Sequence, residues 1–249
     1  MRFTPAHPNK WNGRERHKGE YMRPSVILHC TESSSAVSTV GYFSRLTENN
    51  VRRQAKNEKP IYAGYHVVFD LTNAYCYGDP HTYRAYGAAA GGNDCIHISG
   101  AYYHADWVAG KLDTQTWLQR FAQIVYDLEA EYDIQIEREI VTDPETYKAD
   151  RKRNERAGFY HHATVWPRSR KDPGWTPQQN QQFMDYLGAL DHPQPADLEP
   201  IDQIPLSLQP EYLMAVARGI TDGSRPLEPC TRVEAAIMAL RARQLPQTK

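Results

Sequence analysis

Residues 158 to 175 bring together side chains that can do chemistry. The segment reads GFYHHATVWPRSRKDPGW and contains two adjacent imidazoles, a carboxylate and three positively charged side chains. Its prolines and glycines disfavour a regular helix. A neutral imidazole and a carboxylate are both good Zn²⁺ ligands, and a catalytic zinc ion typically takes three protein ligands and keeps a fourth position for water. The segment can supply two of these ligands, so the third must come from elsewhere in the chain.

His29 is the best donor for the third position. It follows the apolar run VIL at residues 26 to 28, so we expect it at the tip of a buried strand that holds the imidazole rigidly. His66 is its main competitor. For an arbitrary His-His pair such as His161 and His162, two surface or hydrogen-bonded polar histidines would be the simpler interpretation.

Four motifs in the chain resemble a known enzyme family. His162, Pro167 and the sequence DPG at residues 172 to 174 resemble the closing motif of the zinc-dependent N-acetylmuramoyl-L-alanine amidases that are related to peptidoglycan recognition proteins. The sequence VILHCT at residues 26 to 31 resembles the opening strand of that family. GYHVVFD at residues 64 to 70 and NDCIHI at residues 93 to 98 resemble its second and third strands. The motifs occur in the family's order and cover most of residues 24 to 175, so the resemblance is specific.

The resemblance implies a ligand set and a first catalytic group. It implies that His29, His162 and Asp172 bind Zn²⁺, whereas His66 is structural. Tyr65 matches the position where the family has a tyrosine near the zinc-bound water, and a phenol there can donate a hydrogen bond to a developing oxyanion. The alternative for Tyr65 is an ordinary core or groove tyrosine.

The chain departs from the family pattern at two places. The family commonly has a lysine two residues before the third ligand, but here that residue is Arg170, followed by Lys171. Arginine can stabilise an anion but stays protonated, so Arg170 is a poor proton donor to a leaving amine. Many members also carry a glutamate in the third strand, where this chain has Ser99. The proton route therefore stays open between Tyr65, a carboxylate such as Glu32, and water.

Three further residues are candidates for contact with substrate. Thr31 and Glu32 follow the predicted ligand His29 directly, although they could simply cap the next helix. Asn93 ends the glycine-rich segment at residues 85 to 93, which we interpret as a loop lining a groove. The alternative for Asn93 is an ordinary turn residue.

Hydrophobic periodicity predicts the elements that position these residues. We expect a strand at residues 25 to 30 and then a helix that uses Val37, Val40, Phe43 and Leu46. A hairpin of residues 62 to 69 and 74 to 77 follows. An amphipathic helix at residues 113 to 132 is capped by Asp113, with a core face of Trp117, Phe121, Ile124, Val125 and Leu128. The predicted fold is α/β, a central mixed β-sheet flanked by helices.

Weaker signals complete this prediction. Residues 134 to 136 resemble a short strand, the Asp143-Pro144 pair signals a helix start, and Pro177 opens a helix that ends near residue 190. Residues 1 to 23 are expected to form an irregular surface lead-in, and residues 47 to 60 to be exposed. The basic side chains of Arg151, Lys152, Arg153 and Arg156 read as a solvated face.

Composition excludes several classes of protein. The 249 residues carry a net charge of -1, so no general positive field attracts nucleic acid. The sequence contains no run of eighteen or more apolar residues, so no membrane span is predicted. The first residues lack the apolar core of a secretory signal. We therefore expect cytoplasmic synthesis and action on the cell wall after release. Cys30, Cys76, Cys95 and Cys230 are spaced neither as a zinc knuckle nor as a disulfide framework, and are expected to be free thiols.

The chain is predicted to contain two units. Residues 1 to 190 would form the zinc amidase domain, residues 191 to 208 a proline-rich linker, and residues 209 to 249 a small helical module. The phrase GITDG at residues 219 to 223, with the TRVEAA that follows at residues 231 to 236, resembles one surface-layer-homology repeat. Such a resemblance implies a cell-wall polymer as a partner, and a helical hairpin without that role is the alternative.

Together these features predict hydrolysis of the amide bond between N-acetylmuramic acid and L-alanine in bacterial peptidoglycan, by a bacteriophage endolysin. A non-catalytic peptidoglycan-recognition module is the main alternative. A cytoplasmic wall-recycling amidase and a metallopeptidase that cuts within the stem peptide are two others.

Overall fold

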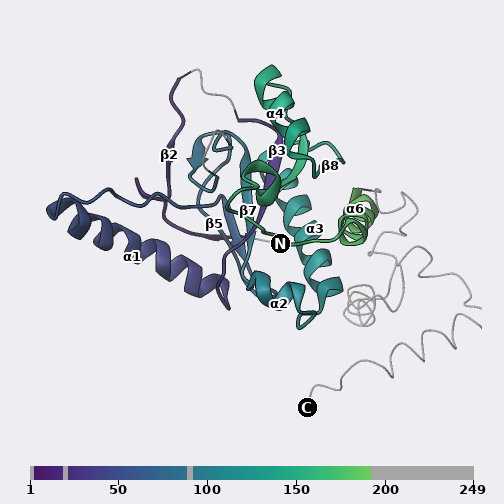
Figure 1. Cartoon of the computed structure of the whole chain (residues 1–249), viewed down its shortest axis with the longest axis horizontal. Coiled ribbons are helices and arrows are strands. Elements are labelled where there is room, and N and C mark those ends of the chain that lie inside the picture. Colours follow the sequence, from purple (N-terminus) through teal and green to yellow (C-terminus); the bar gives the residue numbers. More distant parts are fainter. Residues whose placement is uncertain (1–2, 19–21, 89–91, 192–249) are drawn as a thin grey trace, which may run out of the picture. The chain divides into compact units, whose positions relative to one another are not determined.

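The computed structural model describes residues 3–18, 22–88 and 92–191 (Figure 1). Within these residues the chain forms a seven-stranded mixed sheet in the order β1-β5-β4-β7-β3-β9-β8 and a two-stranded sheet of β2 and β6. The strands of the large sheet are β1 (Thr4–Pro5), β3 (Ser25–Cys30), β4 (Val67–Phe69), β5 (Ala74–Cys76), β7 (Ile96–Gly100), β8 (Ile140–Val141) and β9 (Gly158–His161). The small sheet pairs β2 (Gly13–Glu15) with β6 (Tyr83–Ala85). The predicted α/β class is confirmed.

Six helices flank these sheets in the described residues. They are α1 (Ala36–Ala55), α2 (His104–Val108), α3 (Thr114–Tyr132), α4 (Pro144–Arg153), α5 (His162–Val165) and α6 (Pro177–Asp191). Figure 1 shows α1 and the pair α3 and α6 on opposite sides of the large sheet. Both faces of the sheet are therefore covered, which explains why its central strands are apolar along most of their length.

Strand β3 lies at the centre of the sheet and runs parallel to both of its neighbours, β7 and β9. All six of its residues are buried. Successive side chains of a strand point to opposite faces. Val26 and Leu28 pack in the core cluster that includes residues of α3 and α6, and Ile27 belongs to a separate cluster with residues of α4 and α5. His29 shares the side of Ile27, so it points away from α3 and α6.

The helix that covers the first core cluster matches its predicted pattern. Asp113 caps α3 by accepting a hydrogen bond from the Thr116 amide. The five predicted core residues of this helix are all buried: Trp117, Phe121, Ile124, Val125 and Leu128. The starts of α4, where Asp143 is the cap, and of α6, at Pro177, are also confirmed.

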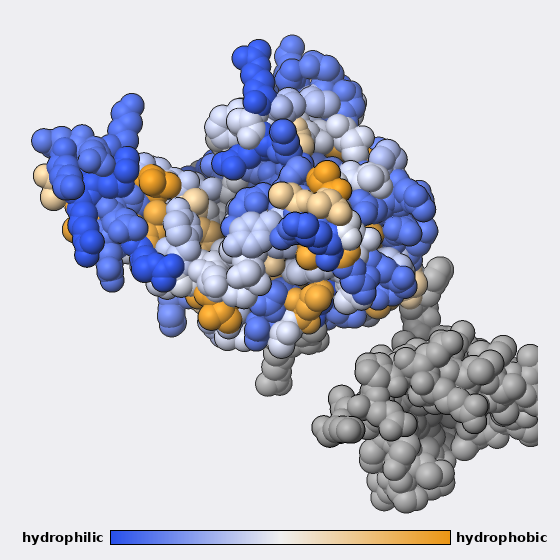
Figure 2. Space-filling view, turned by 60° about the horizontal axis from the view of Figure 1, so that its bottom comes forward, coloured by the Kyte–Doolittle hydropathy of each residue, from blue (hydrophilic) through white to orange (hydrophobic). Residues whose placement is uncertain are grey.

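The core face of helix α1 was predicted in part: Phe43 and Leu46 are buried and Val40 packs against them, but Val37 is not part of it. Its buried residues are Ala36, Thr39, Phe43, Leu46 and Asn50, while Val37 is 54 % exposed. Steps of three residues drift around a helix with 3.6 residues per turn, whereas alternating steps of three and four stay on one side. The helix also extends to Ala55, into the segment that was expected only to be exposed. Its far end, at the left of Figure 2, is covered by hydrophilic residues.

Four other predictions were wrong in detail. Residues 62 to 66 do not pair as a strand, so the hairpin begins at β4, and residues 134 to 136 are unpaired because the edge strand is β8 instead. The N-terminal segment is partly core, since Trp11 is only 2 % exposed and β1 pairs with β5. Arg156 is buried and ion-paired with Asp94, so it does not belong to a solvated basic face.

Residues 192 to 249 lie outside the described part of the chain, and the predicted linker, the helical module and Cys230 fall there. Cys30, Cys76 and Cys95 are free and buried, as predicted. None of the helices in the described residues combines the length and the apolar character needed to cross a membrane.

Candidate metal centre

Parallel pairing of β3 with β9 brings two of the predicted ligands together. Leu28 of β3 stands opposite His161, the last residue of β9, so His29 and His162 each follow one member of this pair. His162 is the first residue of α5, which turns the chain back towards β3. The two imidazoles are 0 % and 3 % exposed, respectively.

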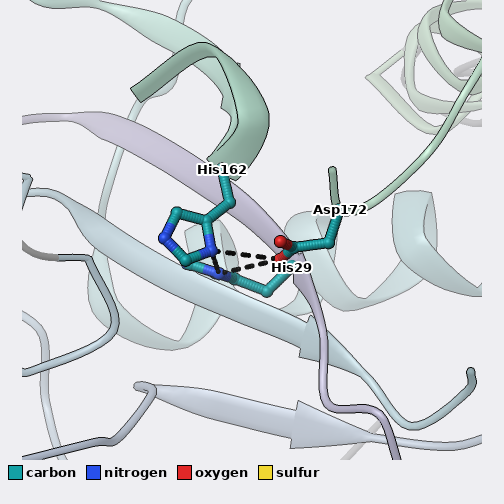
Figure 3. A group of neighbouring side chains, drawn as sticks. All are labelled: His29, His162 and Asp172. Atoms are coloured by element: carbon teal, nitrogen blue, oxygen red, sulfur yellow. Dashed lines mark hydrogen bonds and ion pairs between the residues drawn. The ribbon is translucent and has the colours of Figure 1, made fainter. Parts of the chain in front are cut away.

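Asp172 reaches the same place from the loop between α5 and α6 (Figure 3). Its carbonyl accepts a hydrogen bond from the Ala163 amide, at 3.0 Å, and the next carbonyl, of Pro173, accepts one from the Tyr102 hydroxyl, at 3.2 Å. Both bonds fix the loop against elements that are themselves in the core. The Asp172 carboxylate is consequently held in place and only 8 % of the residue is exposed.

Three potential ligand atoms form a small triangle in this group. The distance from His29 Nδ1 to His162 Nδ1 is 3.0 Å, from His162 Nδ1 to Asp172 Oδ2 3.1 Å, and from His29 Nδ1 to Asp172 Oδ2 3.4 Å. Among the described residues, these three side chains form the group of histidines, cysteines and carboxylates that could hold a metal ion.

The size of the triangle suits a tetrahedral ion. Zinc binds imidazole nitrogen and carboxylate oxygen at about 2.0 to 2.1 Å, so two of its tetrahedral ligand atoms lie about 3.3 Å apart. The three observed separations bracket that value. Two imidazoles and one carboxylate also match the donor types that zinc accepts, and three protein ligands leave a fourth position free.

Protonation favours ligation at neutral pH. Burial, together with the neighbouring His162, lowers the pKa of His29 to about 4, although Asp172 acts in the opposite direction. Burial alone would raise the pKa of Asp172, but the hydrogen bonds and charges of His162 and His29 outweigh it and hold that pKa well below its ordinary value. His29 is therefore neutral and Asp172 ionised, which are the forms that bind metal.

The adjacent histidines of the motif have separate environments. His161 belongs to β9 and its ring packs edge-on to Trp175, with 5.7 Å between centroids, on the side of the sheet that α6 covers. Burial lowers the pKa of His161 to about 4. His162 points to the opposite side, towards His29. The strand alternation thus separates one buried core histidine from one potential ligand.

Tyr65 lies beside the three-residue group. Its ring centroid is 4.9 Å from that of His29, and it also packs against Phe43 of α1. Burial and then the charge of Asp172 raise the pKa of the Tyr65 phenol well above its ordinary value. The phenol is therefore protonated at neutral pH and can donate a hydrogen bond.

Arg170 and Lys171 are both exposed, on the loop that leads to Asp172. The charge of Arg170 contributes to lowering the pKa of His29 and of Tyr65, so its field reaches the group. Arg170 is therefore the better placed of the two cations to act on these side chains.

The candidate substrate residues already make contacts within the protein. The Thr31 hydroxyl lies 2.9 Å from that of Ser33, and the Glu32 carboxylate accepts a hydrogen bond from the His104 amide, at 3.3 Å. Neither residue caps α1, because Ser35 does so. Asn93 accepts a hydrogen bond from the Ala88 amide at 3.2 Å, as a turn residue would. Their contact with substrate stays a prediction.

His97 was not singled out by the sequence patterns, yet it touches the group. Its Nδ1 is 3.0 Å from His29 Nε2, and its ring stacks on that of His29 with 5.2 Å between centroids. Burial, followed by the neighbouring His29 and His66, holds the pKa of His97 well below its ordinary value, so it is neutral. Alternation in β7 could have indicated this, because His97 shares a face with Ser99, which pairs with His29.

His66 is structural, as the sequence resemblance implied. Its ring nitrogens contact the Tyr83 carbonyl, at 2.9 Å, and the His97 amide, at 3.0 Å. Burial lowers the pKa of His66 to about 3. With both nitrogens bonded to backbone groups, His66 is not available as a ligand.

No protein-family model and no curated protein matches the sequence. Solved structures with a similar fold include the following three. The Staphylococcus aureus hydrolase AmiA in complex with its ligand shares 12% identity over 75% of this chain and 83% of its own, with a TM-score of 0.46. The N-acetylmuramoyl-L-alanine amidase LysC from Clostridium intestinale URNW shares 13% identity over 74% of this chain and 97% of its own, with a TM-score of 0.41. The endolysin N-acetylmuramoyl-L-alanine amidase LysCS from the same organism shares 12% identity over 74% of this chain and 95% of its own, with a TM-score of 0.39.

Proposed function

We propose that this protein is a zinc-dependent N-acetylmuramoyl-L-alanine amidase that hydrolyses bacterial peptidoglycan. The observation that carries the proposal is the buried triangle of His29 Nδ1, His162 Nδ1 and Asp172 Oδ2. It supports a metal-assisted hydrolase. The choice of substrate rests on the four sequence motifs, which occur in the order found in the amidase family.

The three ligands would hold the ion in complementary ways. His29 comes from a central strand, His162 from the start of a helix and Asp172 from a pinned loop, so each is fixed by a different part of the fold. Asp172 supplies the negative charge and the neutral imidazoles add none. When bound, Zn²⁺ acidifies a water molecule and polarises the amide carbonyl of the substrate.

Tyr65 and Arg170 would act on the negative charge that develops on the carbonyl oxygen. The phenol of Tyr65 keeps its proton because its pKa is raised, so it can donate a hydrogen bond to that oxygen. Arg170 contributes a permanent positive charge from the loop before Asp172. Lys171, next to it, is the other candidate cation. The leaving amine would take its proton from Tyr65, from Glu32 or from water.

We further propose that the enzyme is a bacteriophage endolysin. The support is the resemblance of residues 219 to 236 to a surface-layer-homology repeat, a unit associated with cell-wall polymers. A wall-recycling amidase would not need such a unit. Binding of the full chain to walls that have been stripped of secondary polymers would separate the two roles, because an endolysin that uses this unit loses affinity for them.

The decisive experiment follows the products released from purified peptidoglycan. The full chain is treated with a chelator, then supplied with Zn²⁺, and products are identified by mass spectrometry. We expect intact stem peptides that begin with L-alanine, absent after chelation and restored by zinc. Peptides cut within the stem would indicate a metallopeptidase, and binding without released peptide would leave a recognition protein; either result overturns the proposal.

A further inference from the structure

We propose that His97 is a positioning residue that holds His29 in the tautomer protonated at Nε2 and so aims a free electron pair at His162 and Asp172. The consequence for metal binding rests on the proposed function. The tautomer itself can be tested without any metal.

The first step concerns three imidazoles in a row. His66 immediately precedes β4, His97 lies in β7 and His29 in β3, and all three are 0 % exposed. Their rings stack with centroid distances of 5.9 Å, for His66 to His97, and 5.2 Å, for His97 to His29. At this depth each ring nitrogen needs a partner inside the protein, because an unpaired buried polar group is costly.

The second step fixes the proton on His66. The His97 amide can only donate, and it lies 3.0 Å from His66 Nδ1, so that nitrogen accepts. The remaining nitrogen, Nε2, then carries the proton and donates to the Tyr83 carbonyl at 2.9 Å. The backbone of β7 and that of β6 thereby determine the state of His66.

The third step applies the same logic to His97. A carbonyl can only accept, so His97 Nε2, 3.0 Å from the Gly92 carbonyl, carries the proton and donates. A neutral His97 then has a free electron pair on Nδ1. His29 Nε2 lies 3.0 Å from that atom and must donate to it. Metal-binding histidines commonly donate their second ring N–H to a carboxylate, a backbone carbonyl or water, and here an imidazole nitrogen takes that place.

The fourth step follows for His29. With its proton on Nε2, the Nδ1 atom is an acceptor, and it faces the Asp172 carboxylate oxygen at 3.4 Å. Two acceptors at this distance repel each other unless a cation or a proton lies between them. A proton on His162 Nδ1, which lies 3.0 Å from His29 Nδ1 and 3.1 Å from Asp172 Oδ2, or a bound cation would remove this repulsion. His97 therefore leaves His29 Nδ1 with a free electron pair that can bind a cation.

Gly87 shows how closely this arrangement is packed. A Cβ atom at Gly87 would lie 2.4 Å from His97 Nδ1 and 2.9 Å from the Gly64 carbonyl. Glycine is thus needed for the chain to pass this close to His97. Replacement of Gly87 by alanine would displace the His97 ring without removing either of its nitrogens.

Nitrogen-15 NMR of the histidine rings in the metal-free full chain tests the tautomer directly. We expect His29 to be protonated at Nε2 in the wild type and in His97→Gln, whose amide can accept from His29 and donate to Gly92. His97→Phe keeps a ring but removes the acceptor, and should give a mixture of tautomers at His29. A wild-type protein protonated at His29 Nδ1 would overturn the proposal.

Zinc affinity, measured by competition with a chromophoric chelator, provides the second readout. His97→Phe and Gly87→Ala should weaken zinc binding by about 10- to 100-fold, and His97→Gln should restore most of it. The control is His66→Phe, which removes a neighbouring buried imidazole that does not touch His29. Unchanged affinity in His97→Phe would contradict the proposal. A wild type that binds no zinc, with His29 protonated at Nε2, would refute the proposed function and leave the role of His97 intact.

Discussion

Two pairs of buried histidines near the centre of the large sheet have different hydrogen-bond partners. His66 and His97 direct nitrogens at the carbonyls of Tyr83 and Gly92. His29 and His162 direct one nitrogen each at the other and at Asp172. All four are buried to within a few per cent, so burial does not distinguish them. The difference lies in the partners, since a backbone carbonyl consumes a nitrogen whereas converging nitrogens leave electron pairs for a cation.

The largest effect should come from removing the negative charge of the group formed by His29, His162 and Asp172. Asp172→Asn keeps the shape of the side chain but loses the anionic ligand. We expect peptidoglycan hydrolysis to fall by about a thousandfold, because a bound metal ion supplies several kcal/mol of transition-state stabilisation. Product release and zinc content per protein would be measured together.

Asp113→Asn is a matched control for this variant. It makes the same chemical change at the cap of α3, where asparagine also caps well, so activity and zinc content should be unchanged. If Asp172→Asn retained full zinc content and activity, the contrast between the two pairs of histidines would have no functional meaning.

Of the two histidines that bond to backbone carbonyls, His66 should contribute to stability rather than to activity. His66→Phe leaves the Tyr83 carbonyl and the His97 amide without their side-chain partner. We expect the free energy of unfolding to drop by about 2 to 4 kcal/mol, since each unsatisfied buried group costs about 1 to 3 kcal/mol. Urea denaturation measures this loss, and the folded fraction should still bind zinc. Loss of zinc from folded His66→Phe would place His66 in the metal centre.

Acid should destabilise the protein through the same residue. The pKa of His66 is about 3 in the folded state, below the value near 6.5 that histidine has when unfolded. The unfolded state therefore binds the extra proton first, so stability is lost as pH falls below about 6.5. Between pH 7 and pH 5, protonation of His66 in the unfolded state lowers the free energy of unfolding by about 2 kcal/mol.

In His66→Gln the side chain cannot titrate. Its free energy of unfolding should therefore fall by about 2 kcal/mol less than that of the wild type between pH 7 and pH 5. Urea unfolding at the two pH values provides the comparison, with zinc absent so that ligand protonation at the other pair does not contribute through metal release. An equal loss in both proteins would show that His66 is accessible to protons in the folded state.

The smallest effect should come from the two exposed cations on the loop before Asp172. Arg170→Gln and Lys171→Gln remove adjacent charges from one exposed loop, and the charge of Arg170 contributes to lowering the pKa of His29 and of Tyr65. We expect kcat/KM to fall by about tenfold in Arg170→Gln, as for a partly screened charge near an oxyanion, and to change little in Lys171→Gln. A larger effect of Lys171→Gln would assign the oxyanion role to that residue.

Much of the fold was predictable from local patterns. The run VIL before His29 predicted a buried central strand, and the stripe from Trp117 to Leu128 predicted the helix that covers it. Caps at Asp113 and Asp143 were readable because a side-chain oxygen accepts from amides two or three residues later. In α1 the same approach found Phe43 and Leu46 but included the exposed Val37 and missed the buried Thr39, because a polar residue on the core face gives no hydrophobic signal.

The N-terminal segment shows where local reasoning stops. Trp11 is buried in the cluster that contains Val68 and Tyr83, far away in the sequence, and β1 forms an edge of the large sheet through β5. Polar, proline-rich sequence around these residues gave no periodic signal. Burial there depends on surfaces provided by other elements, which a local window does not contain.

By itself the sequence determined which side chains were available for chemistry and the order in which the motifs occur. Only the tertiary structure decided which imidazoles meet. The parallel register of β3 with β9 joins His29 to His162, and that of β3 with β7 sets His97 against His29. Whether a histidine is a ligand or a structural residue depends on what lies within hydrogen-bonding distance of each nitrogen. That distance is set by strand pairing between segments up to 133 residues apart, so no local pattern encodes it.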